Sequence, residues 1–149
     1  MFKRIIVPID NSKAGKLALS KAIELSQMHK AKLCIVHVID YIALSAKVEG
    51  TDHDLVHQKF KTAAQKLLDN AKKKASLKKV KVEIKLIESY KLTSRVHTLI
   101  LNAVNTWRAD LVVVGMNKKG GLQKLFYGSH SEKMIERISA PILLFKSKS

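Results

Sequence analysis

The sequence predicts an α/β fold in which helices cover both faces of a doubly wound, five-stranded parallel sheet. Short apolar stretches rich in Val and Ile alternate with longer stretches of helical periodicity, and this alternation is typical of parallel sheets. The chain has 149 residues, 46% of them hydrophobic, which suits one core. We therefore expect residues 1–149 to form a single domain.

The first half of the chain predicts two buried strands separated by a helix. Each strand is a short, β-branched apolar run, as expected for a strand covered on both faces. Apolar side chains recur at helical spacing between them, and Asn11 or Ser12 could cap that helix. The predicted elements are a strand at Phe2–Ile9, a helix at Asn11–Lys30, a strand at Ala31–Asp40 and a connecting loop at Tyr41–Thr51.

The second half continues the alternation. Its first strand alternates strictly between apolar and polar residues, which indicates a half-exposed strand at a sheet edge. The next strand is apolar throughout and precedes a glycine-rich loop. The predicted elements are a helix at Asp52–Ala75, a strand at Val80–Glu88, a helix at Leu92–Trp107, a strand at Ala109–Gly115, a helix at Ser129–Ser139 and a strand at Ala140–Lys146.

The strand order 3-2-1-4-5 follows from these patterns. The alternating strand belongs at an edge, the first and fourth strands look central, and right-handed crossovers leave few other topologies. In this order the first and fourth strands are neighbours where the winding direction reverses. Ligands of such sheets bind beyond the carboxyl ends of the strands at that point. The segments expected there are Pro8–Asp10 and the loop that follows Gly115.

Two interpretations of this loop remain open. Its glycines allow close approach and sharp reversal, and the helix expected after Gly128 begins with free N–H groups that suit a phosphate. The nearby hydroxyls and ammonium groups belong to Ser129, Ser131, Lys118, Lys119 and Lys124. Alternatively, Ser129–Glu132 is a capping box that satisfies the first turn of the helix without a ligand. Asp10, at the end of the first predicted strand, could likewise cap the first helix.

The sequence resembles the universal stress protein family over nearly its whole length. The matching segments are "IIVPIDNS", "IVHVID", "ADLVVVG", "GSHSE" and "APILLF", in this order. The resemblance implies a regulatory module, not an enzyme, that binds ATP or a related adenine nucleotide with Mg²⁺ or Mn²⁺. It implies that Pro8, Ile9, Asp10 and Val38 line the adenine and ribose side. The residues implied to hold the phosphates are Gly115, Met116, Gly128, Ser129, His130 and Ser131.

One position departs from the nucleotide-binding pattern of that family, G-x2-G-x9-G-[S/T]. Gly115 and Gly128–Ser129 match it, and Gly121 matches a further glycine of the loop, but Lys118 stands where the second glycine is expected. A left-handed backbone there would cost a non-glycine residue about 1–2 kcal/mol, whereas the ammonium could pair with a phosphate oxygen. We expect weakened or re-routed nucleotide binding. The alternative is a family member that binds no nucleotide and acts through protein contacts or through its basic surface.

The net charge of +16 raises nucleic-acid binding as a third hypothesis. The densest basic stretch is Lys72–Lys85, but arginines are few and aromatic residues are scattered, so a lysine-rich solvated surface is the plainer interpretation. His53 and His57 are four apart on a predicted helix, yet no third metal ligand accompanies them. Cys34 reads as a buried small side chain. No nucleophile–base set can be assembled.

The remaining expectations concern location and assembly. No apolar run is long enough to span a membrane, no signal peptide is recognisable, and the single cysteine cannot form an internal disulfide, so we expect a cytoplasmic protein with no membrane partner. The apolar last strand, Pro141–Phe145, would lie at a sheet edge, and an unprotected apolar edge invites pairing. Together with the family resemblance, this predicts a homodimer through that strand.

Overall fold

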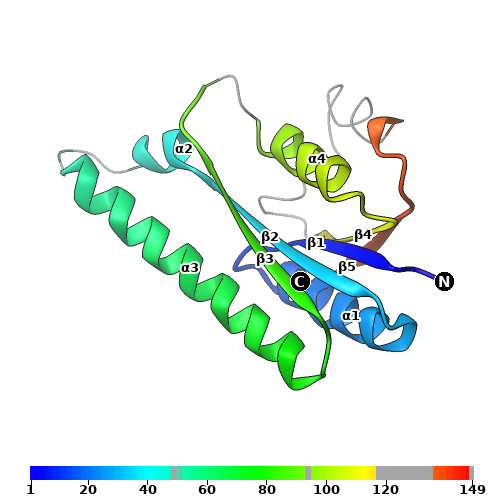
Figure 1. Ribbon diagram of the computed structural model, residues 1–149. Coiled ribbons are helices and arrows are strands. Elements are labelled where there is room, and N and C mark those ends of the chain that lie inside the picture. The colour runs from blue at the N-terminus through cyan, green and yellow to red at the C-terminus, as the bar shows by residue number, and fades with distance from the viewer. Residues whose placement is uncertain (48–49, 51, 93–94, 117–135, 148–149) are drawn as a thin grey trace.

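The computed structural model describes the chain except residues 48–49, 51, 93–94, 117–135 and 148–149. Nine helices and strands fall in the described ranges (Figure 1). They are β1 (Arg4–Pro8), α1 (Lys13–His29), β2 (Lys32–Asp40), α2 (Tyr41–Ser45), α3 (His53–Leu77), β3 (Val82–Ser89), α4 (Val96–Trp107), β4 (Leu111–Met116) and β5 (Ile142–Lys146).

The strands form one parallel sheet in the order β3-β2-β1-β4-β5, which confirms the predicted order. β3 lies at an edge, as its alternating sequence predicted, and its Glu83 and Lys85 are exposed. β1 and β4 are central, and their side chains are buried almost without exception. The expected strands and the first three expected helices all form; the expected helix at Ser129–Ser139 falls largely outside the described residues.

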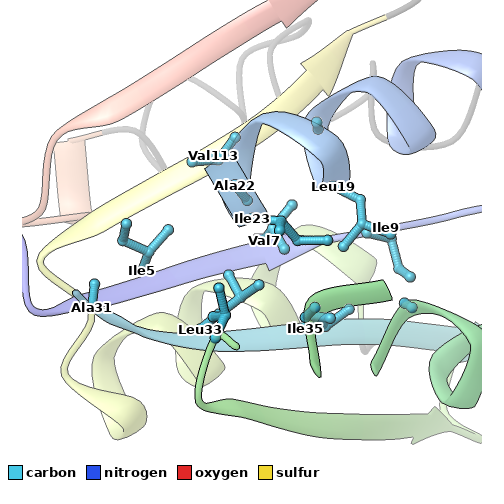
Figure 2. Close-up of a cluster of buried hydrophobic side chains, with 14 of the residues drawn as sticks. Ile5, Val7, Ile9, Leu19, Ala22, Ile23, Ala31, Leu33, Ile35 and Val113 are labelled. Carbon is cyan, nitrogen blue, oxygen red and sulfur yellow. The ribbon is translucent and has the colours of Figure 1, made fainter. Parts of the chain in front are cut away.

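Each face of the sheet has its own layer of apolar side chains. On one face, α1 and α3 pack against alternate residues of β1, β2 and β4. Figure 2 shows part of this cluster, in which Val7 of β1 lies next to Ile23 of α1. On the other face, α4 packs against the intervening residues of the strands. Ile6, Cys34 and Val112 belong to the same buried cluster as Trp107 of α4. The side-chain alternation of the strands therefore separates the two layers.

One prediction for this region was wrong. The segment after β2 was expected to be a loop from Tyr41 to Thr51, but Tyr41–Ser45 form the short helix α2. Asp40 caps α2, since its Oδ1 accepts a hydrogen bond from the N–H of Ala43 at 3.1 Å. Five residues are too few to display helical periodicity, which explains why the sequence pattern missed this helix.

No helix in the described ranges is both long and apolar enough to cross a bilayer.

Candidate functional site

The centre of the sheet is the point where its winding direction reverses. β1 pairs with β2 on one side and with β4 on the other, where Ile5 lies opposite Leu111 and Ile6 opposite Val112. The carboxyl ends of β1 and β4 therefore lie side by side, as predicted. This is the position at which open parallel sheets bind ligands.

Two hydrogen bonds to β2 fix the end of β1. The N–H of Ile9 donates to Val36 O at 2.8 Å, and Nδ1 of His37 lies 2.8 Å from Ile9 O. Because a carbonyl only accepts, Nδ1 of His37 carries a proton in this contact. The side chains of Pro8 and Ile9 are buried in the core, so these two residues can face a ligand mainly through their backbone.

Asp10 begins a chain of hydrogen bonds that starts α1. Its Oδ1 accepts from the N–H of Ser12 at 3.0 Å and also from the Ser12 hydroxyl. The Ser12 oxygen in turn accepts from the N–H of Gly15 at 3.0 Å, which makes Ser12 the N-cap. In the described part of the chain, no group donates to Oδ2 of Asp10. The half-buried carboxylate can therefore both support the cap and present one oxygen to a ligand.

Gly115 and Gly15 allow α1 to begin against the strand ends. A Cβ on Gly115 would lie 2.1 Å from the carbonyl oxygen of Ala14, and a Cβ on Gly15 would lie 2.6 Å from Oδ1 of Asp10. Both distances are far shorter than any van der Waals contact. The side of Gly115 on which a Cβ would lie therefore faces the backbone of α1. This glycine has a packing role whether or not a ligand lies near it.

A groove opens beside the ends of β1 and β2. Its volume is about 660 Å³, within the range typical of small-molecule sites. Half-buried Val38 contributes to it, and it runs beneath α2 and along α3. Its lining consists of Asn11, His37, Val38, Ile39, Asp40, Ala43, Leu44, Phe60, Ala63, Ala64, Lys66, Leu67 and Asn70.

The predicted site residues thus divide into two groups. Pro8, Ile9, Asp10, Val38, Gly115 and Met116 all lie at the carboxyl ends of β1, β2 and β4. Half-buried Met116 ends β4, and its carbonyl accepts from Ser147 N at 3.1 Å. The other predicted residues lie outside the described ranges: Lys118, Gly121, Gly128, Ser129, His130 and Ser131.

Sequence reasoning missed a polar and aromatic cluster at the carboxyl end of β3. The Tyr41 ring stacks on the Tyr90 ring, with centroids 4.7 Å apart. The Tyr41 ring also contacts the His57 ring, and these two centroids are 4.3 Å apart. The Tyr41 hydroxyl donates to Oε1 of Glu88 at 2.7 Å, and Lys61 Nζ lies 3.5 Å from the same oxygen. Its members come from separate segments of the chain, so no local sequence pattern announced it.

The cluster shifts the titration of two of its groups. The hydrogen bond from Tyr41, reinforced by the Lys61 ammonium, lowers the pKa of Glu88. Burial, followed by the Glu88 hydrogen bond and charge, raises the pKa of Tyr41 well above its ordinary value. Glu88 is therefore ionised and Tyr41 neutral at pH 7.

Cys34 is a buried small side chain, as the sequence predicted. Cys34 is buried under α4, and burial raises the pKa of its thiol to about 11, so its thiolate is scarce at neutral pH. His57 belongs to the Tyr41 cluster. No group of three or more His, Cys, Asp or Glu side chains suited to a metal occurs among the described residues.

Comparison with known proteins identifies the family. A family model for universal stress proteins matches residues 1–146. The chain belongs to the universal stress protein family. Two universal stress proteins are similar in sequence: one from Methanocaldococcus jannaschii is 28% identical over 98% of this chain and 83% of its own length, and YxiE of Bacillus subtilis is 31% identical over 98% of this chain and 100% of its own.

Solved structures of universal stress proteins share the fold. One from Burkholderia pseudomallei has a TM-score of 0.74 at 23% identity and covers 98% of this chain and 97% of its own. A universal stress protein in complex with cAMP has a TM-score of 0.66 at 15% identity, with 97% of each chain covered. One from Archaeoglobus fulgidus in complex with dAMP has a TM-score of 0.62 at 17% identity and covers 96% of this chain and 97% of its own.

Proposed function

We propose that this universal stress protein binds ATP or a related adenine nucleotide at the carboxyl ends of β1 and β4. The pairing of β1 with β4 at the reversal point is the observation that carries the proposal. It brings Asp10 at the end of β1 to the end of the strand from which the glycine-rich loop departs. Complexes of related structures with cAMP and dAMP support the choice of an adenine nucleotide.

The base and the ribose have candidate partners on the β1–β2 side. Half-buried Val38 offers an apolar contact beside the groove at the end of β2, and Oδ2 of Asp10 is suited to accept from a ribose hydroxyl. The phosphates are then assigned, from the sequence pattern alone, to the loop that contains Gly128 and Ser129. Lys118 in that loop is expected to weaken or re-route the phosphate contacts.

Mg²⁺ or Mn²⁺ fits this site as a companion of the nucleotide. Asp10 supplies a carboxylate oxygen, the ligand type that these ions prefer. Among the described residues no larger cluster of metal ligands occurs, so the ion would take its other ligands from nucleotide phosphates and water, as Mg²⁺ often does. The ion would neutralise phosphate charge, while the chain's own residues hold the base and the ribose.

We assign the bound nucleotide a regulatory role. The described residues at the strand ends offer a carboxylate and backbone groups, and the imidazole of His37 is engaged with Ile9 O through Nδ1. They do not form a nucleophile–base–orienter arrangement. Nucleotide binding would instead change a surface that a partner protein recognises.

Replacement of Asp10 by Asn tests the site. Asn keeps an oxygen that can accept from Ser12 and so preserves the cap, but it removes the charge. We expect Asp10→Asn to weaken MgATP binding about tenfold, which is about 1.4 kcal/mol, as measured by titration calorimetry. The matched control is Asp52→Asn, since Asp52 also caps a helix, through Oδ1 and the N–H of Asp54, but lies at the start of α3. Equal losses in both variants would contradict the assignment.

The same titration separates this proposal from its alternative. Saturable heat with the wild-type protein supports nucleotide binding. If the wild-type protein gives no heat at millimolar ATP but Lys118→Gly does, the chain is a family member whose loop has lost its nucleotide, and it acts through protein contacts. If neither protein binds, the proposed site itself is wrong.

A further inference from the structure

The amino end of the sheet, opposite the proposed nucleotide site, gathers lysines from three adjacent strands. Lys32 N donates to Lys3 O at 2.9 Å, and Leu33 N donates to Lys81 O at 2.8 Å. Lys32 lies beside Lys81, because the next residues, Leu33 and Val82, are paired in the sheet at the strand spacing of about 4.8 Å. Lys32 is paired with Arg4 on its other side, so Lys3 lies one residue before this pair and completes the row of lysines at the starts of β1, β2 and β3. All three are exposed. Like charges on adjacent strands repel each other, and a bound anion would relieve this repulsion.

Two turns between helices and strands add three more lysines. Lys30 follows α1, and Lys78 and Lys79 follow α3. Lys30 and Lys79 have φ values of 54° and 59°, a left-handed conformation that usually belongs to glycine at helix ends. A side chain there costs about 1–2 kcal/mol, and Arg108, which follows α4 outside this groove, has the same conformation.

These six lysines line one groove of about 810 Å³, which we call the amino-edge groove. Its other lining residues are Met1, Arg4, Ser26, Gln27, His29, Ala31 and Val80, so no carboxylate contributes to the lining. The chain begins at this side of the sheet in Figure 1, and α2 lies at the opposite end. The lysines come from three separate parts of the sequence.

The positive charge of the groove is not neutralised within the described residues. Among the described residues, ion pairs join Lys21 to Glu24 and Lys61 to Glu88. None of these four residues lines the groove. Asp110 is the carboxylate beside Lys3, and its two oxygens accept from the backbone N–H groups of Lys3 and Arg4 at 2.7 and 2.9 Å. Attraction to the negative helix ends stabilises the charges of Lys30 after α1 and Lys78 after α3. It gives no stabilisation to the lysines at the strand starts.

We propose that the amino-edge groove binds the phosphate backbone of a nucleic-acid duplex. Lysine ammonium groups act as point charges toward phosphates and lack the planar fork with which arginine reads bases. Arg4, the one arginine of the lining, is already engaged, because its Nε and one terminal nitrogen donate to Trp107 O at 2.9 and 2.7 Å. The groove therefore offers backbone contacts without base readout.

The surroundings of Trp107 favour a duplex over a single strand. Single-strand sites stack bases on exposed aromatic rings. The Trp107 ring is covered by the Arg4 guanidinium at 4.0 Å, its Nε1 donates to Glu83 at 2.8 Å, and the residue is only 9% exposed. Phe2 near the groove is half-buried against His29. Neither ring is placed to stack on a base.

The test measures duplex binding by fluorescence anisotropy at several salt concentrations. The probe is a labelled 20-base-pair duplex, and the variant carries Lys32→Gln, Lys78→Gln and Lys81→Gln, which spares the two left-handed positions. We expect at least tenfold weaker binding at 0.1 M salt. We also expect the slope of log K against log salt to fall by up to about 3, since each phosphate contact contributes about 0.9.

The matched control carries Lys47→Gln, Lys59→Gln and Lys91→Gln. These exposed lysines lie away from the groove, after α2, in the amino-terminal half of α3 and after β3, and the control loses the same net charge. A small change in the control with a large change in the groove variant supports the proposal, provided that both unfold at the wild-type temperature. Equal losses in the two variants, no wild-type binding at 0.05 M salt, or tighter binding of a single strand or of anionic vesicles would overturn it.

Discussion

At the scale of single residues, two glycines decide how closely the chain packs around the proposed nucleotide site. Gly115 ends the buried part of β4 against the carbonyl of Ala14, and Gly15 lies against the carboxylate of Asp10. Neither glycine needs a left-handed backbone, because neither has a positive φ. Their role is to leave room for backbone and side-chain atoms that belong to the protein itself.

Gly115→Ala should therefore destabilise the protein strongly. Its Cβ would meet the Ala14 carbonyl oxygen at 2.1 Å and the carbonyl carbon at 2.5 Å, and these backbone atoms cannot turn aside. Overpacking of this kind costs about 1–3 kcal/mol or more, to be measured by urea unfolding. Ala63→Ser on the exposed part of α3 is the control and should change stability by less than about 1 kcal/mol. A Gly115→Ala protein of wild-type stability would show that α1 can retreat from β4.

At the scale of helices and strands, the Tyr41–Glu88 contact holds the unexpected helix α2 to the sheet. Tyr41 is the first residue of α2 and is buried, and Glu88 lies near the end of β3. Lys61 of α3 joins the same carboxylate oxygen. One carboxylate thus links α2 and α3 to the edge strand β3, which pairs with another strand, β2, on one side only.

Tyr41→Phe should raise the pKa of Glu88 toward its ordinary value, because the hydroxyl is the principal group that lowers it. A lowered carboxyl pKa stabilises the fold above the unfolded value of about 4.3, and this contribution is lost as pH falls through the folded value. The wild-type protein should therefore lose stability more steeply than the variant between about pH 5 and pH 3. At neutral pH the lost hydrogen bond should cost about 1–2 kcal/mol.

Carboxyl titration by NMR measures this effect directly. An unchanged Glu88 pKa in Tyr41→Phe would contradict the role given to the hydroxyl.

The sequence predicted these elements well where a long periodic pattern exists. The β-branched runs of β1, β2 and β4 and the alternation in β3 led to the correct sheet order, because burial on two faces or one leaves a direct trace in the residue types. α2 left no such trace, since it has five residues and depends on a cap and on Tyr41. The start of α4 was also placed too early: Leu92 is 85% exposed and the helix begins at Val96.

The sites were less predictable because they combine distant segments. Asp10 follows β1 and Val38 lies near the end of β2, but their contacts with a nucleotide stay predictions. The dense basic stretch Lys72–Lys85 does not form one surface patch in the structure. In the structure its members separate, and Lys78, Lys79 and Lys81 join lysines that precede them by about fifty residues or more in the sequence. Only the parallel strand order brings these groups together.

At the scale of the whole molecule, β5 leaves one edge of the sheet without a strand partner in the described chain. β5 pairs with β4 on one side only among the described strands. Its apolar residue Leu143 is 38% exposed to solvent. Edges of this kind are prone to pair with another chain. We propose that two copies of the protein associate through Pro141–Phe145.

Leu143→Lys should weaken this association. A charge at the centre of a short apolar edge opposes burial of that edge. Light scattering after size exclusion should give twice the 16.7 kDa chain mass for the wild-type protein and a value nearer the single-chain mass for the variant. Leu77→Lys is the control, since Leu77 is also an exposed leucine, 83% accessible at the end of α3. A wild-type monomer at high concentration would refute the proposal.

The contact between Gly115 and Ala14 also limits how related proteins could diverge. Because backbone meets backbone there, any larger residue at position 115 must push away the start of α1, and with it the cap that Asp10 and Ser12 form. The ligand preference of the proposed nucleotide site could not then be altered through residue 115. If the proposed site is correct, a change in its ligand preference would have to come from Val38 or from the sequence beyond Met116, while Gly115 stays constant.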